Sequence, residues 1–113
     1  MKLQIIEANA RRNGNIIING WKLEGFENLE IVGSEKQLSW CEEILAGAIG
    51  EAVESVGKKL GLVQNSCTTE DNWAELEPKV EGFVAQVSAK LKGANAKAII
   101  DGRGSLKAIM ANL

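Results

Sequence analysis

Few residues in this chain could carry chemistry, and histidine is absent from all 113 positions. Without histidine the chain lacks the commonest general base, the commonest zinc ligand and the usual charge switch near neutral pH. The two cysteines, Cys41 and Cys67, are distant in sequence, and a cysteine or serine nucleophile would have no histidine to activate it. The carboxylates lack the spacing of a calcium-binding loop. We therefore expect no catalytic residue, no metal and no cofactor, and we predict that the protein is not an enzyme.

Paired carboxylates are the one remaining route to acid–base chemistry. The pairs are Glu42–Glu43, Glu51–Glu54 and Glu75–Glu77. All three lie in segments of helical pattern, where charges are most simply a solvated face. Carboxylates also outnumber cations between residues 34 and 92, so a basic partner could meet this region by complementary charge.

Cations that could hold an anion lie in two predicted loops. Arg11 and Arg12 precede a turn signal, and Arg103 stands between two glycines shortly before Ser105 and Lys107. Backbone N–H groups at a helix start, with arginine and lysine beside them, can hold a phosphate. The spacing matches neither the phosphate-loop nor the dinucleotide fingerprint, and a solubilised turn and ordinary helix capping are the simpler interpretations. These five residues define an alternative hypothesis, a small nucleic-acid-binding or anionic-ligand-binding module.

The element that would position most of these side chains is one long amphipathic helix over residues 33–61. Ser34 and Gln37 form a capping-box pattern, and Gly61 suits the left-handed conformation that ends a helix. Apolar residues recur at three- and four-residue steps between these ends, which predicts a stripe that faces the core. The stripe comprises Leu38, Cys41, Leu45, Ala48, Ile49, Ala52, Val53, Val56 and Leu60.

The opposite side of this helix carries Trp40, Ile44 and Gly47, and a purely solvated face would not usually hold them. One interpretation is internal: a second element crosses there, with glycine allowing close approach, or the helix kinks. The other is that the patch meets a partner. Under the second interpretation the predicted protein-binding residues are Trp40, Ile44, Gly47, Glu51 and Glu54.

The first 32 residues predict a three-stranded antiparallel meander and a connector to the helix. Asn13-Gly14 and Asn19-Gly20 lie between apolar runs, which is the strongest short signal for a hairpin. The expected strands are near 2–9, 14–18 and 21–25. The meander would pack on the long helix, because three strands with one apolar face need a cover.

The helical part spans residues 33–113, and two to four further helices are expected after the long one. Residues 63–67 read as a polar linker, after which Thr68 or Thr69 can cap a new helix. Pro78 either separates two helices or kinks one helix. Two short helices are expected near 94–100 and 106–112. The prediction is a single α+β domain over residues 1–113.

Composition supports an ordinary soluble protein, with 45% apolar residues, 25% charged residues and a net charge of −2. The apolar run at the start of the chain is interrupted by Glu7 and is too short for a signal peptide. No apolar run in the sequence is long enough to span a membrane. We therefore expect a cytoplasmic protein with reduced cysteines and no membrane partner. The oligomeric state is left open.

The start of the long helix resembles a group of small uncharacterised bacterial and phage-type proteins. The resemblance rests on Gly33-Ser-Glu-Lys-Gln37 followed by Trp40 and Glu42-Glu43, and on a C-terminal segment that here reads Ala96-Lys97-x-x-Ile100-Asp101-x-Arg103. The chain departs from that group after the tryptophan, where it has Cys41 and Ile44-Leu45, and before Ile100, where it has Ala98-Ile99. It would be a divergent member.

The resemblance implies a mobile-element context and no particular reaction. Small acidic phage-type proteins without catalytic activity often bind and block host defence machinery, and anti-CRISPR proteins are among them. The expected function is a non-catalytic protein-binding inhibitor or accessory protein, blocking a host defence effector such as a CRISPR-Cas complex. The expected partner is a larger bacterial protein or ribonucleoprotein, with nucleic acid as the less favoured partner.

Overall fold

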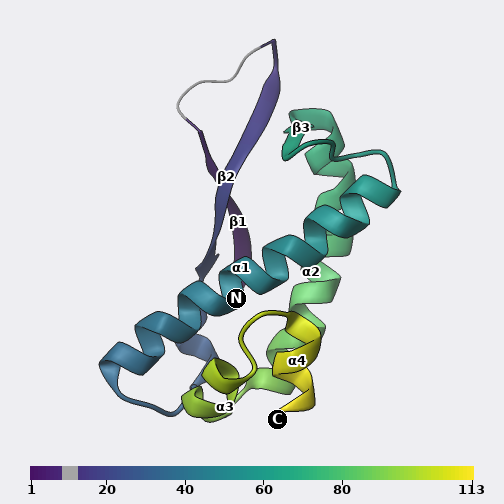
Figure 1. The fold of residues 1–113 in the computed structure, drawn as a ribbon. Helices are drawn as coiled ribbons and strands as arrows, with labels where there is room; N and C mark the ends of the chain where they lie inside the picture. Colours follow the sequence, from purple (N-terminus) through teal and green to yellow (C-terminus); the bar gives the residue numbers. More distant parts are fainter. Residues whose placement is uncertain (9–12) are drawn as a thin grey trace.

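The protein has an α+β fold in which a three-stranded antiparallel sheet packs against a long helix, followed by further helices. The computed structural model describes residues 1–8 and 13–113. Strands β1 (Lys2–Glu7) and β2 (Asn15–Glu24) form a ribbon, and helix α1 (Glu35–Lys59) crosses it (Figure 1). The other elements are η1 (Phe26–Leu29), β3 (Cys67–Thr69), α2 (Glu70–Leu91), α3 (Ala96–Asp101) and α4 (Leu106–Ala111).

Strand β2 runs without interruption through Asn19-Gly20, so the predicted second turn is wrong. A type I′ turn needs positive φ at both central residues. That geometry occurs at Asn13 (53°) and Gly14 (76°), as expected for the first turn, and at neither Asn19 nor Gly20. Pairing with β1 continues on both sides of Asn19, because Glu7 pairs with Ile18 and Ile6 pairs with Gly20. Asn19 is therefore the extra residue of a β-bulge.

The third strand begins at Cys67, the last residue of the predicted polar linker, and includes Thr68 and Thr69, which were predicted only as helix caps. Residues Gln64 and Cys67 exchange two backbone hydrogen bonds of 2.9 Å around Asn65 and Ser66, both of which have positive φ. This tight turn directs β3 antiparallel to the first residues of β2, with Ile17 opposite Cys67. The sheet order is β1-β2-β3, so β2 is the central strand.

Helix α1 begins as predicted, but its buried side is rotated from the predicted stripe. The Ser34 hydroxyl accepts from the backbone N–H of Gln37, whose side chain accepts in return from the Ser34 N–H. Val56 and Leu60 were assigned to the core and are 46% and 49% exposed. The buried residues of the helix are Cys41, Leu45, Ala46, Ile49, Gly50, Val53 and Gly57.

Two glycines explain this rotation, because they allow other elements to approach the helix backbone. A Cβ atom at Gly50 would lie 2.1 Å from Cδ1 of Trp21 in β2. A Cβ atom at Gly57 would lie 2.5 Å from Cγ2 of Val63, in the turn after the helix. Real Cβ atoms do not make such contacts, so β2 and the following loop can pack here only against glycine.

Two of the C-terminal helices begin at predicted caps. Thr69 caps α2 and Ser105 caps α4, and Asn95, which was not predicted as a cap, caps α3, each by accepting a backbone N–H on its side-chain oxygen. Pro78 lies inside α2, which is one continuous helix rather than two. One hydrophobic cluster contains residues from β1, β2 and all four α-helices. Within the described part of the chain, no helix is both long enough and apolar enough to cross a bilayer.

Candidate protein-binding site

The face of α1 that was predicted to bind a partner begins with an exposed tryptophan. Trp40 is 46% exposed, and Ile44, one turn later, is half-buried and packs against the core. A Cβ atom at Gly47 would have no described atom within 4 Å. Among the described residues, contrary to that hypothesis, no second element crosses close at Gly47, and internal packing accounts for Ile44 but not for Trp40.

Glu51 and Glu54 share this face of α1 but lie away from Trp40. At a rise of 1.5 Å per residue, Glu54 is about 21 Å along the helix axis from Trp40. The two glutamates line a separate open hollow of about 360 Å³, whose other wall is the turn around Asn65 and Ser66. The predicted five-residue surface thus consists of an aromatic end and an acidic end.

Arg103, one of the residues of the alternative anion-binding hypothesis, lies over the ring of Trp40. Cζ of Arg103 lies 5.2 Å from the Trp40 ring centroid, within the range of a cation–π contact. At an exposed site such a contact contributes about 0.5–1 kcal/mol. The structure therefore brings together residues from α1 and from the α3–α4 loop.

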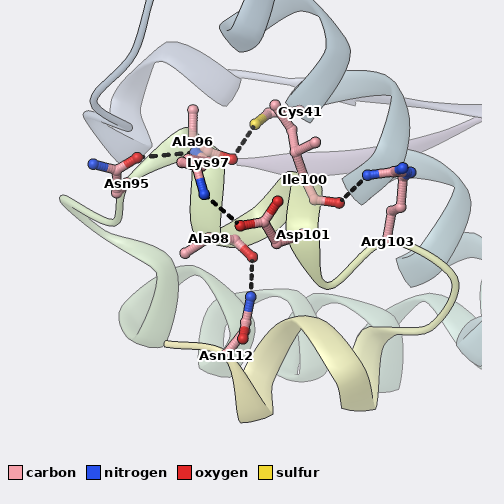
Figure 2. A network of polar contacts seen from close by, with 9 residues as sticks. All are labelled: Cys41, Asn95, Ala96, Lys97, Ala98, Ile100, Asp101, Arg103 and Asn112. Carbon is pink, nitrogen blue, oxygen red and sulfur yellow. Dashed lines mark hydrogen bonds and ion pairs between the residues drawn. The ribbon is translucent and has the colours of Figure 1, made fainter.

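Local backbone geometry explains where Arg103 lies. A Cβ atom at Gly102 would lie 2.7 Å from Cα of Ile109, so only glycine lets α4 fold back this closely onto the end of α3. The next residue, Arg103, donates from Nη1 to the carbonyl of Ile100 at 2.9 Å (Figure 2). Arg103 thus caps the end of α3, which agrees with the interpretation as ordinary helix capping, and it also stacks on Trp40.

Helix α3 is held against α1 and the connector before it, which fixes Arg103 relative to Trp40. The buried Cys41 thiol donates to the carbonyl of Ala96 at 3.3 Å (Figure 2). Val32 donates from its backbone N–H to Ala94 and accepts from Ala96, at 2.9 and 2.8 Å. These contacts join the residue next to Trp40 directly to the segment that carries Arg103.

Burial also changes the chemistry of Cys41. Desolvation raises the pKa of its thiol, because the charged thiolate would lose its hydration in the core. Both cysteines are free thiols, and Cys67 is half-buried. Cys41 therefore packs and donates a hydrogen bond rather than serving as a reactive group.

The residues of the alternative anion-binding hypothesis are not gathered into one described site. Arg11 and Arg12 lie outside the described residues. The Ser105 hydroxyl accepts from the backbone N–H of Ala108 at 3.0 Å, so it serves as a helix cap. Lys107 is exposed on α4, and Arg103 contacts Trp40 and Ile100. Anion binding by this set remains a prediction.

Sequence reasoning identified Trp40 and Arg103 but missed their contact. They are far apart in the chain, and no periodic pattern links a helix face to a loop after two further helices. The only sequence signal for a close turn there was the glycine at position 102.

Comparison with protein-family models, with curated proteins and with solved structures finds no match to this chain.

Proposed function

We propose that this protein is a non-catalytic binding protein that meets a larger protein partner through the surface formed by Trp40 and Arg103. The observation that carries the proposal is that Trp40 is 46% exposed while Cζ of Arg103 lies 5.2 Å from the centroid of its ring. Tryptophan and arginine are the residue types most enriched among those that dominate the energy of protein interfaces. Here they stand together on one surface.

Their rigidity supports the same proposal. Association costs the freedom of every side chain that it orders, about 0.5–1.5 kcal/mol for a flexible one. Arg103 is already held by Ile100 and Trp40, so less of this cost arises on binding. A guanidinium has five N–H donors, which leaves several for a carboxylate or carbonyl of the partner. Ile44 beside the stack extends the apolar part of the surface.

The class of partner rests on the resemblance described above. Under that resemblance the protein acts as an inhibitor or accessory protein of phage or mobile-element type and occludes a bacterial effector, such as a CRISPR-Cas complex. The acidic end of the same helix face, at Glu51 and Glu54, adds a place for basic groups of a ribonucleoprotein partner.

The experiment is affinity capture from a bacterial lysate, followed by titration of the captured partner with purified variants. Trp40→Ala and Arg103→Ala remove the two members of the stack. Val56→Ala is the matched control: Val56 lies in the same helix with the same 46% exposure, about 160° around the axis from Trp40. We expect Trp40→Ala to weaken binding about 30-fold, equivalent to about 2 kcal/mol, and Val56→Ala to change it less than about twofold.

Charge reversal at Glu51 and Glu54 tests the acidic end separately. We expect this change to weaken binding of the captured partner and to make that binding less dependent on salt. A partner held equally well by the wild type, Trp40→Ala and Arg103→Ala would overturn the proposal. Titration with short DNA and RNA at low salt addresses the alternative: a salt-dependent shift that survives Trp40→Ala would favour nucleic acid as the ligand.

A further inference from the structure

Strand β1 has an open backbone edge. It is the outer strand of the sheet, so alternate residues direct their N–H and C=O groups away from β2. Among the described residues, no backbone hydrogen bond joins Lys2–Ile6 to any element other than β2. Unpaired strand edges of this kind are templates for an added strand.

Helix α2 stands beside this edge and makes a groove of it. One hollow of about 580 Å³ is lined by every residue of β1, by Ile16 and Lys22 of β2, and by four residues of α2 between Glu70 and Glu77. A second hollow of about 440 Å³ continues between Met1–Leu3 and α2 as far as Ser88. The two share Lys2, Leu3 and Glu77, so together they follow β1 along its length of about 20 Å.

We infer that this groove binds an extended segment of a partner protein as a fourth strand beside β1. An added strand satisfies the outward N–H and C=O groups of β1, whereas a helix uses its own backbone groups internally and would leave them unpaired. The site is separate from the surface formed by Trp40 and Arg103, and its test does not depend on that surface.

The walls of the groove indicate the chemistry of the segment. The charged residues on the α2 side are all acidic: Glu70, Glu77 and Glu81. Glu77 and Glu81 make no ion pair within the described residues. Trp73, which is half-buried, supplies apolar surface on the same wall, and the buried Val80 and Val84 lie at the floor of the second hollow. Because side chains of a strand alternate between two faces, every second residue of the segment meets α2, and these should be basic and apolar.

A seven-residue peptide serves as the probe, with threonine at odd positions and lysine, valine and lysine at even positions. Nuclear magnetic resonance of the wild-type protein follows the exchange of the β1 amides with solvent. We expect the peptide to protect alternate amides of β1 and to shift the Trp73 indole signal. A peptide with glutamate in place of lysine should bind at least fivefold more weakly.

Backbone methylation of the peptide tests strand pairing without changing the protein. Two versions carry N-methyl groups at odd or at even positions only. We expect one of them to lose at least tenfold in affinity, because its methyl groups face β1, while the other keeps its affinity. Equal affinities for the two methylated peptides would overturn the inference.

Two variants of α2 test the charge of the wall. Glu81→Lys should weaken the lysine peptide about fivefold, whereas Glu75→Lys, an exposed residue of the same helix outside both hollows, should leave affinity within twofold. Equal weakening by both variants, or no β1 protection at millimolar peptide, would contradict the inference. Protection of the β1 amides that rises with protein concentration in the absence of peptide would show that a second copy of this chain pairs with the edge. That result would overturn the inference.

Discussion

Gly47 and Gly50 are less than one turn apart in α1 and have opposite surroundings. At Gly47 a Cβ atom would meet no described atom within 4 Å, whereas at Gly50 it would overlap the Trp21 ring. Alanine is favoured over glycine in a helix by about 1 kcal/mol. We therefore expect Gly47→Ala to stabilise the protein by about 0.5–1 kcal/mol.

At Gly50 the same change should destabilise the protein by about 1–3 kcal/mol, because Trp21 must move. Urea denaturation of the two variants measures both free energies of unfolding. If Gly50→Ala were as stabilising as Gly47→Ala, Trp21 would not pack on this helix as described.

The buried thiol of Cys41 predicts a loss of stability at alkaline pH. Its pKa is raised in the folded protein, whereas the unfolded thiol ionises near the ordinary value of 9.0. As pH rises above about 9 the unfolded state loses this proton while the folded state keeps it, so the free energy of unfolding falls. Cys41→Ala should be less stable at neutral pH and should show a shallower fall between pH 8 and 10. Identical slopes for the two proteins would argue that Cys41 is solvated.

At the scale of an element, α1 is started by a reciprocal cap. Removing the hydroxyl in Ser34→Ala leaves a backbone N–H without its acceptor and should cost about 1 kcal/mol of stability. Ser39→Ala is the matched control in the same helix, at an exposed position without a cap. Thermal unfolding followed by circular dichroism gives both values. A control that loses as much stability as Ser34→Ala would show that the cap is not responsible.

The α3–α4 pair shows how a short element gains a defined position. Two six-residue helices have little stability alone, because helix formation has a costly first turn. Their caps, the backbone hydrogen bonds of Val32 with Ala94 and Ala96, and the close turn at Gly102 hold them in place beside α1. The exposed Lys97–Asp101 ion pair at 3.0 Å contributes little by comparison.

At the scale of the whole molecule, one hydrophobic cluster is shared by the sheet and the helices. It contains Leu3 of β1, Ile49 of α1, Val84 of α2 and Ile109 of α4. Loss of any one element would therefore expose the others, and we expect a single cooperative unfolding transition. Tryptophan fluorescence and far-ultraviolet circular dichroism should give the same midpoint and slope in urea. Two separate midpoints would contradict the prediction of a single domain over residues 1–113.

Features that depend on neighbouring residues could be predicted from the sequence. Capping and turn geometry involve only a few successive residues, so local patterns predicted the start of α1 at Ser34, the caps of α2 and α4 and the turn at Asn13-Gly14. The α+β class followed from the order of the segments, with strand patterns first and helix patterns after them. Trp40 could be recognised as an unusual residue for a solvated face, since helical periodicity alone assigns it there.

Which surfaces meet depends on contacts between distant segments and became visible in the folded protein. The buried side of α1 follows from where Trp21 and Val63 reach the helix backbone, and the third strand follows from its pairing with β2. The contact between Trp40 and Arg103 joins segments separated by most of the chain. Such contacts depend on the shape of the whole core, which no local pattern of residues encodes.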